Sequence, residues 1–242
     1  MTDAYLLVTH GSRDPRPQIA ASQLAQQVAT SLLATQTAGK PVVVGTAQLE
    51  LSETPLHVQI GDFASKYAQH GIERVVVLPL FLIPGVHAIE DIPAEVALAN
   101  ARGQIQSILA PFLGSHPDLA NVFAQNRSGS IDRTMILAHG SRRSGGNQPV
   151  EDLAARLGVH TAYWSVPPSL TDRVTELIAT GADKIEILPY FLFAGGITDA
   201  IAAAVAQLRT QLPQVELTLG EPIGNSPELV TIICNLLLDS FA

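Results

Sequence analysis

The chain has 242 residues, of which 47% are hydrophobic and 15% are charged, and its formal net charge is −8. This composition excludes a disordered chain, and an acidic chain whose largest basic cluster is the Arg142–Arg143 pair is a poor partner for nucleic acid. No apolar run reaches the roughly 18 residues that span a bilayer, and the start of the sequence lacks the basic region of a signal peptide, so we expect a cytoplasmic protein without a membrane partner.

Short apolar runs alternate with segments of helical periodicity along the chain. In the first half the pattern predicts strands at 4–9, 41–49, 74–81 and 105–110 and helices at 18–33, 55–69, 92–101 and 116–124. In the second half it predicts strands at 133–138, 159–165, 183–191 and 214–219 and helices at 149–157, 169–180, 197–211 and 226–240. Strands that are apolar throughout are buried on both faces, so this α/β alternation predicts mainly parallel sheets with helices on each side.

The chain contains an internal duplication. The sequence LLVTHGSR at 6–13 returns as MILAHGSR at 135–142, and VLPLFL at 77–82 returns as ILPYFL at 187–192. Two motifs in the same order indicate two homologous domains, which we place at 1–128 and 129–242 on either side of a polar turn-like stretch. Each domain is expected to hold a four-stranded, mainly parallel sheet flanked by helices, and the two domains to face each other across a central cleft.

Three segments at strand ends carry residues that could do chemistry. Ligands of open parallel sheets bind beyond the carboxyl ends of the strands. His10 follows the first predicted strand, Glu50 ends the second, and His87 lies in the loop after the third. Two imidazoles and one carboxylate suit a first-row divalent metal ion and leave coordination positions open. The sequence therefore predicts a metal site formed by His10, Glu50 and His87.

Each of these residues also has an ordinary structural explanation. His10 and His87 could be loop histidines, Glu50 could be a solvated glutamate at the rim, and Asp91 could be the N-cap of the helix that follows it. Glu90 could be a solvated acid of the first helical turn. The tetrapeptide His10-Gly11-Ser12-Arg13 recurs at His139. This recurrence favours a functional role, but it could also be a remnant of the duplication.

The segments LLVTHGSR and LPLFLIPGVHAIEDIP resemble those of the sirohydrochlorin chelatases, in the class II chelatase group. The resemblance covers essentially the whole chain, including the duplication. It implies that His10 and His87 act on the metal and on the pyrrole nitrogens with help from Glu50. It also implies that the neighbouring residues of the two loops contact the substrate, namely Gly11, Ser12, Arg13, Gly85 and Val86.

The function implied by the resemblance is insertion of a divalent metal into sirohydrochlorin, with release of two protons and no prosthetic group. Fe²⁺ is favoured over Co²⁺ because the chain lacks the His-rich or cysteine-cluster tail of many cobalt-directed relatives. In the second half His139 is retained, but Ser165 stands opposite Glu50 and Ile197 opposite His87. We therefore assign the chemistry to the first half and a role in closing the cleft to the second.

Other readings stay open at this point. The chain could be a non-catalytic carrier of tetrapyrrole or metal, or a histidine-dependent phosphatase with a phosphate cradle around His10. Sirohydrochlorin carries eight carboxylates, which conflicts with the acidic net charge. Arg13, Arg142, Arg143 and helix N-termini would have to compensate locally. Fusion of two halves is compatible with a monomer, with a weak homodimer as the alternative.

Overall fold

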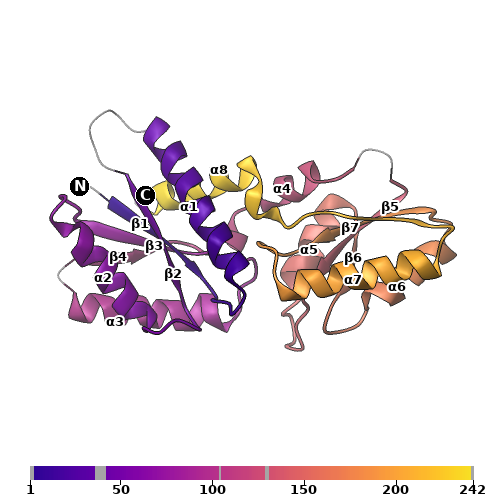
Figure 1. The fold of residues 1–242 in the computed structure, drawn as a ribbon, viewed down its shortest axis with the longest axis horizontal. Coiled ribbons are helices and arrows are strands. Elements are labelled where there is room, and N and C mark those ends of the chain that lie inside the picture. The colour runs from indigo at the N-terminus through magenta and orange to yellow at the C-terminus, as the bar shows by residue number, and fades with distance from the viewer. Residues whose placement is uncertain (1–2, 36–41, 104, 129–130, 241–242) are drawn as a thin grey trace. The chain divides into compact units, whose positions relative to one another are not determined.

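Two parallel sheets organise the chain in the computed structural model, which describes residues 3–35, 42–103, 105–128 and 131–240 (Figure 1). The first sheet contains β1 (Asp3–Thr9), β2 (Val43–Gln48), β3 (Arg74–Pro79) and β4 (Gln106–Leu109) in the order β2-β1-β3-β4. The second contains β5 (Arg133–Ala138), β6 (His160–Tyr163), β7 (Lys184–Pro189) and β8 (Glu216–Leu219) in the order β6-β5-β7-β8. All pairings are parallel, as the alternating pattern predicts.

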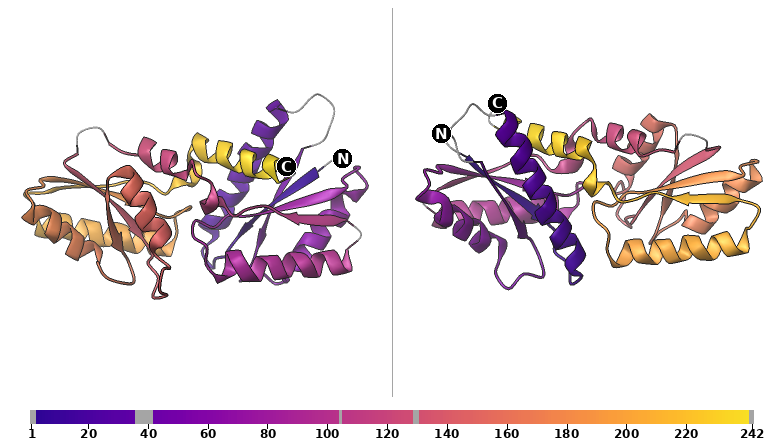
Figure 2. Two further views of the ribbon diagram at one scale, coloured as in Figure 1. Left: turned by 180° about the vertical axis from the view of Figure 1, so that it is seen from behind. Right: turned by 45° about the horizontal axis from the view of Figure 1, so that its top comes forward.

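Helices cover both faces of each sheet (Figure 2). Along the chain they are α1 (Pro15–Thr35), α2 (Leu56–Ala68), α3 (Ile92–Arg102), α4 (Leu119–Gln125), α5 (Gln148–Leu157), α6 (Leu170–Ala179), α7 (Gly196–Gln211) and α8 (Pro227–Asp239). On the first sheet, α2 and α3 pack side by side on one face and α1 packs with α8 on the other. None of the helices in the described ranges is long and apolar enough to cross a membrane.

Burial on both faces explains why the strands lack an alternating pattern. Leu6 and Val8 of β1 belong to the core beneath α2 and α3, whereas Leu7, between them, points to the opposite face. All three side chains are at most 1% exposed. Burial of each such side chain stabilises the fold by about 1.5–3 kcal/mol, so the apolar runs determine where the strands form.

Two local features differ from the sequence prediction. Helix α1 begins at Pro15 rather than at residue 18, because proline is well tolerated in a first helical turn. The segment His87–Asp91, predicted to be a loop, forms a short π-helix that runs directly into α3. Asp91 stands at the N-cap position of α3, as the sequence suggested, but its side chain makes no capping hydrogen bond and its backbone is already helical.

Each compact unit of the structure contains the last helix of the other sequence repeat. Unit 1 comprises Met1–Pro117 and Asn225–Ala242, and unit 2 comprises Asp118–Gly224. Helix α8 therefore packs with α1 and β3 in unit 1, and α4 packs with α5 in unit 2. The predicted division at 128 and 129 describes repeats of sequence, and the folding units cross it. Helical periodicity identifies the apolar face of a helix but not the sheet that the face will cover.

We predict that Leu237→Ala in α8 destabilises unit 1. Leu237 is fully buried, and loss of such a side chain costs about 2–5 kcal/mol through lost burial and the cavity left behind. Native-state hydrogen exchange should show faster exchange of the β1 and β3 amides. Leu238→Ala, at the neighbouring 41% exposed position, is the matched control and should change stability by less than about 0.5 kcal/mol. Faster exchange confined to β5 and β7 would contradict the assignment of α8 to unit 1.

Candidate metal site at the carboxyl end of the first sheet

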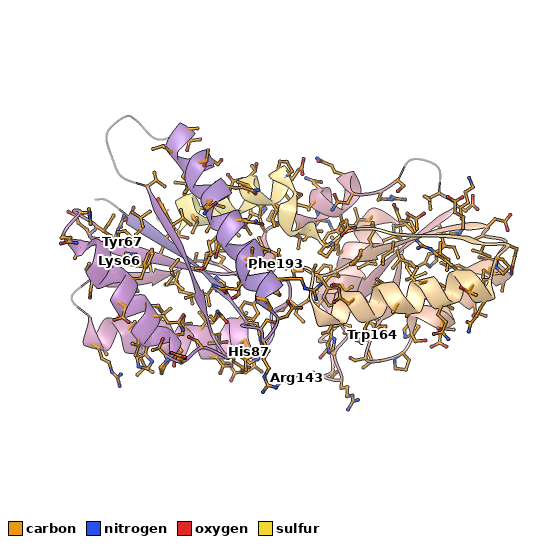
Figure 3. All side chains as sticks on the ribbon, viewed as in Figure 1. Lys66, Tyr67, His87, Arg143, Trp164 and Phe193 are labelled. Atoms are coloured by element: carbon orange, nitrogen blue, oxygen red, sulfur yellow. The ribbon has the colours of Figure 1, made fainter. Side chains whose placement is uncertain are left out.

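Three strand ends of unit 1 bring the predicted residues together. His10 directly follows β1, Glu50 lies two residues beyond β2, and His87 begins the π-helix after β3. Adjacent parallel strands end at the same edge, so side chains far apart in the sequence meet there. Figure 3 shows His87 at this end of the sheet of unit 1.

The hydrogen-bond ladder of β1 and β2 continues past the strands and places His10 beside Glu50. The Leu49 N–H donates to the Thr9 carbonyl at 2.9 Å, and the Glu50 N–H donates to the His10 carbonyl at 2.8 Å. Gly11 has φ +102°, and a Cβ at this position would lie 2.0 Å from the Glu50 carbonyl oxygen. Only glycine therefore allows the first loop to pass so close to the second.

The two imidazoles direct the same nitrogen at the carboxylate. His10 Nε2 lies 3.7 Å from Glu50 Oε2, and His87 Nε2 lies 3.9 Å from Glu50 Oε1. The imidazole rings are 4.8 Å apart in an edge-to-face arrangement. The side chains are 48%, 49% and 35% exposed for His10, Glu50 and His87, so one side of the cluster stays open to a ligand.

The other nitrogen of each imidazole is held by an acceptor. His87 Nδ1 lies 2.7 Å from Asp91 Oδ2, and His10 Nδ1 lies 3.3 Å from the Gly11 carbonyl oxygen. A carbonyl and a carboxylate accept hydrogen bonds, so Nδ1 of each imidazole is placed as the donor, and in the neutral tautomer with this proton Nε2 has the lone pair that binds a metal. The π-helix makes the contact with Asp91, which lies four residues after His87.

This arrangement suits a divalent metal ion. One ligand atom from each of His10, Glu50 and His87 can be chosen so that all lie within 4.8 Å of one another. Bonds of about 2.1 Å to nitrogen and oxygen place adjacent ligand atoms roughly 3.0–3.4 Å apart, so small side-chain rotations would close the cluster around an ion. Three ligands leave coordination positions for water or for an incoming nitrogen ligand.

The residues predicted to bind substrate shape the two loops. Ser12 Oγ accepts the Asp14 N–H at 3.0 Å and so fixes the first loop. Arg13 is exposed and has no hydrogen bond or ion pair with any described residue. Gly85 offers its carbonyl to the Ala88 and Ile89 amides, each at 3.1 Å, and Val86 precedes the π-helix. Contact of Gly11, Ser12, Arg13, Gly85 and Val86 with a substrate stays a prediction.

Acidic side chains line a hollow next to the cluster. The hollow has a volume of about 370 Å³ and is lined by Glu50, Asp91 and Glu95 among others. These carboxylates would attract a cation to the site. Arg16 is bound to Asp14 through Nε at 3.1 and 3.0 Å, so it is not available as part of a phosphate cradle. The loop around His10 therefore gives the phosphatase alternative no support.

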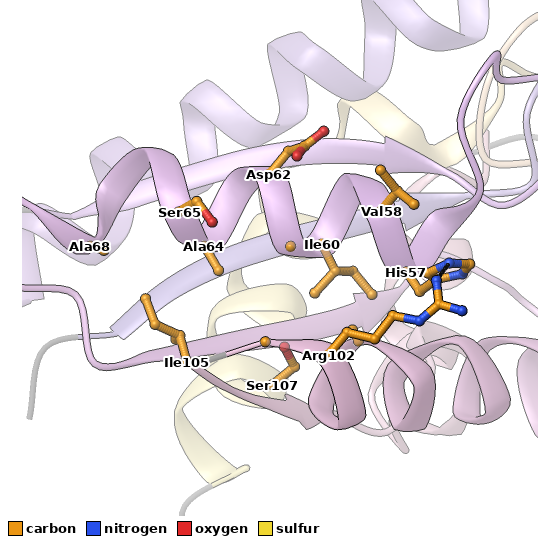
Figure 4. A pocket seen from close by; sticks show the side chains of 13 residues that line it. His57, Val58, Ile60, Asp62, Ala64, Ser65, Ala68, Arg102, Ile105 and Ser107 are labelled. Atoms are coloured by element: carbon orange, nitrogen blue, oxygen red, sulfur yellow. Dashed lines mark hydrogen bonds between the residues drawn. The ribbon is translucent and has the colours of Figure 1, made fainter.

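A larger hollow of about 530 Å³ lies between α2 and α3 (Figure 4). At one end, Arg102 Nη1 donates to His57 Nε2 at 2.8 Å, and His57 Nδ1 lies 2.9 Å from Glu95 Oε2. Arginine only donates, so Nδ1 of His57 carries the ring proton and donates to Glu95. These three side chains serve as hydrogen-bond partners for one another and join the two helices. We therefore assign this network to the packing of α2 on α3 rather than to chemistry.

Sequence reasoning missed three features of the site. Asp91 is the partner of His87, and its spacing of four residues would have indicated this had the helix been predicted to start at His87. The Phe81 ring lies 6.4 Å from that of His10 and 6.3 Å from that of His87. Leu51, next to Glu50, is 57% exposed and is the one non-glycine residue with positive φ in the described ranges. No sequence signal predicts that conformation.

The same edge of unit 2 repeats the backbone and keeps His139, but it lacks the counterparts of Glu50 and His87. The Trp164 N–H donates to the Ala138 carbonyl and the Ser165 N–H to the His139 carbonyl, each at 2.9 Å, as in the ladder of unit 1. Ser165 therefore occupies the position of Glu50, as the sequence comparison of the halves indicates. Among the described residues of unit 2 no cluster of three metal ligands occurs.

Comparison with known proteins identifies the family of the chain. The sequence model of the CbiX family matches residues 4–128 and again residues 133–240. The chain belongs to the CbiX family. The sirohydrochlorin cobaltochelatase of Priestia megaterium is 26% identical to this CbiX protein over 250 residues, which cover 95% of this chain and 77% of the relative. The chloroplastic sirohydrochlorin ferrochelatase of Arabidopsis thaliana is 32% identical over 121 residues, which cover 50% of this chain and 49% of the relative.

Solved structures confirm the expected class II chelatase-like fold for this member of the CbiX family. SirB from Bacillus subtilis with Fe³⁺ gives a TM-score of 0.77 at 22% identity, covering 100% of this chain and 96% of that chain. SirB from Bacillus subtilis subspecies spizizenii with cobalt gives a TM-score of 0.76 at 22% identity, with coverage of 99% and 95%. The predicted resemblance to sirohydrochlorin chelatases is thereby confirmed.

We predict that Gly11→Ala damages both the stability of unit 1 and its metal site. The added Cβ would have to leave the Glu50 carbonyl and the backbone would have to leave its positive φ, at a cost of at least about 1–3 kcal/mol. The melting temperature should fall, and so should the affinity for Co²⁺ measured by absorbance titration. Gly61→Ala in α2, where an added Cβ meets nothing within 4 Å, is the matched control. Equal melting temperatures for the two variants would refute this role of Gly11.

We also predict that Asp91→Asn weakens metal binding by about 10- to 100-fold. The carboxylate orients the His87 ring by holding Nδ1, and loss of such partners of a metal-binding histidine has effects of this size. Co²⁺ titration provides the measurement. Glu90→Gln removes the same charge from the adjacent exposed position and should have a much smaller effect. If both variants lose the same affinity, Asp91 acts only through its charge and not by orienting His87.

Proposed function

We propose that this chain inserts a divalent metal ion into sirohydrochlorin at the carboxyl end of the sheet of unit 1. The observation that carries the proposal is the cluster in which His10 Nε2 and His87 Nε2 both face the Glu50 carboxylate. Membership of the CbiX family supports it, since curated relatives are named sirohydrochlorin cobaltochelatase and sirohydrochlorin ferrochelatase.

In the proposed mechanism His10, Glu50 and His87 present the ion with its remaining positions on water. The pyrrole nitrogens of the macrocycle replace the waters and the side chains on the ion one by one. Two pyrrole N–H protons leave as the doubly charged ion enters, so the total charge is conserved. As the ion leaves each of these side chains, the released Nε2 atom or Glu50 carboxylate can accept one of the two protons. Asp91 then stabilises a positive charge on His87 through the hydrogen bond to Nδ1.

We propose Fe²⁺ as the favoured substrate metal and Co²⁺ as the alternative. Imidazole and carboxylate accept either ion, so the donor set of the site does not discriminate between them. Curated relatives named for each metal resemble the chain, so the rates measured with the two ions decide between them. The metal is a substrate in this proposal, and no prosthetic group is invoked.

The test is an anaerobic absorbance assay of the purified protein with sirohydrochlorin and either Fe²⁺ or Co²⁺. We expect the wild type to accelerate the spectral change of metal insertion. His10→Ala and Glu50→Gln should each lower the rate by at least about 100-fold, since loss of a direct ligand should exceed the 10- to 100-fold effect of losing an outer partner. The ratio of the two wild-type rates then reports the metal preference.

The design has one control and two contrary outcomes. Circular dichroism spectra of both variants should match the wild type, because the replaced side chains are half exposed. Full activity of His10→Ala would overturn the assignment of the site. A bound-tetrapyrrole spectrum without acceleration by either metal would replace the proposal with a carrier function. The monomeric state and the cytoplasmic location stay predictions.

A further inference from the structure

The charged positions of the metal site have uncharged counterparts in unit 2. The equivalence is fixed by the backbone, because the Tyr190 N–H donates to the Leu137 carbonyl at 2.8 Å as the Leu80 N–H donates to that of Val8. Aligned from these two hydrogen bonds, residues with no charge replace the histidine and the acids of the third loop and of α3, and one acid, Asp199, takes the place of Ile89. The pairs are His87 with Ile197, Glu90 with Ala200, Asp91 with Ile201 and Glu95 with Val205.

The loop after the first strand of unit 2 instead gains a positive charge relative to that of unit 1. Asp14 of unit 1 corresponds to Arg143 of unit 2, so the HGSR motif continues with an acid in one unit and with a base in the other. Asp14 binds Arg16, and this hydrogen-bonded arginine holds the pKa of the Asp14 carboxyl below its usual range. Arg142 and Arg143 are exposed, and neither has an acidic partner among the described residues.

Hydrogen bonds fix the backbone of the loop that carries the two arginines. The Ser141 N–H donates to Asn147 Oδ1 at 2.8 Å, and Asn147 Nδ2 donates back to the Ser141 carbonyl at 3.2 Å. The Gly146 N–H donates to the Arg143 carbonyl at 3.0 Å. Since these hydrogen bonds already order the loop, binding of an anion to Arg142 and Arg143 would not carry the entropy cost of ordering its backbone.

An exposed aromatic ring belongs to the same edge. Trp164 is the single tryptophan of the chain, is 37% exposed, and takes the position that Leu49 has in unit 1. Figure 3 shows Trp164 and Arg143 at this end of the sheet of unit 2. An indole offers a flat apolar face, and guanidinium groups bind carboxylates through paired hydrogen bonds. Together they match a flat macrocycle with carboxylates on its rim.

We propose that Arg142, Arg143 and Trp164 form a binding surface for the carboxylates and ring face of the tetrapyrrole. The proposal rests on the proposed function for the identity of the ligand. The surface lies within unit 2, at the carboxyl end of its sheet, where the loop after β5 carries Arg142 and Arg143 instead of an arginine and an acid. Local positive charge at this edge would overcome the repulsion expected from a net charge of −8.

The test uses Trp164 as its own reporter. Titration of the full chain with sirohydrochlorin, without metal, should quench tryptophan fluorescence, because the chain has no other tryptophan. Arg142→Gln/Arg143→Gln should raise the Kd by at least about tenfold and reduce its salt dependence, since two exposed charge-assisted contacts are removed. In the insertion assay the same double variant should raise KM by a larger factor than it lowers kcat.

A matched control removes two positive charges elsewhere. Lys66→Gln/Arg133→Gln changes exposed residues of α2 and of the amino end of β5, and should leave the Kd within about twofold of the wild type. An unchanged Kd for the Arg142/Arg143 variant, in a protein that still inserts metal, would overturn this inference and leave the proposed function intact. Absence of both quenching and insertion in the wild type would overturn the proposed function itself.

Discussion

The close approach of two loop backbones at Gly11 and Glu50 is the constraint on which the site depends. Two backbone hydrogen bonds extend the β1–β2 ladder beyond the strands there, and they bring His10 and Glu50 to the same height above the strand ends. A side chain at residue 11 would separate the loops and with them two of the three candidate metal ligands. The third, His87, is aligned independently through the π-helix and Asp91. The metal cluster thus depends on a glycine at residue 11, which lets the two loop backbones approach, and on the side-chain hydrogen bond between His87 and Asp91.

The two units show which features of the site come from the backbone fold and which come from the side chains placed on it. Both units have the same strand order, and both extend the first ladder past the strands through equivalent amides. On this shared backbone, unit 1 places carboxylates and imidazoles, whereas unit 2 places arginines and an indole. Because a fold fixes positions and not chemistry, one architecture can hold a cation in one copy and offer positive charge in the other.

Because each compact unit contains the last helix of the other repeat, the sequence repeats and the compact units of the structure do not coincide. The repeats of sequence are contiguous, but each compact unit contains a helix from the other repeat. Helix α8 completes the apolar layer over the first sheet together with α1, and α4 has the corresponding role with α5. A stability effect in α8 is therefore expected at the sheet that carries the metal cluster, although α8 is the last helix of the second repeat.

The sequence by itself determined the alternating α/β order, the parallel sheets, the duplication and the three candidate ligands, because buried strands must be apolar and strand ends must share an edge. It also determined that unit 2 lacks the counterparts of Glu50 and His87. Only the tertiary structure decided which sheet α8 covers, that Asp91 orients His87, and that Leu51 adopts a positive φ. These outcomes depend on packing between segments distant in sequence and on a helix that starts earlier than its local pattern indicates. A periodicity of apolar residues contains no information about either.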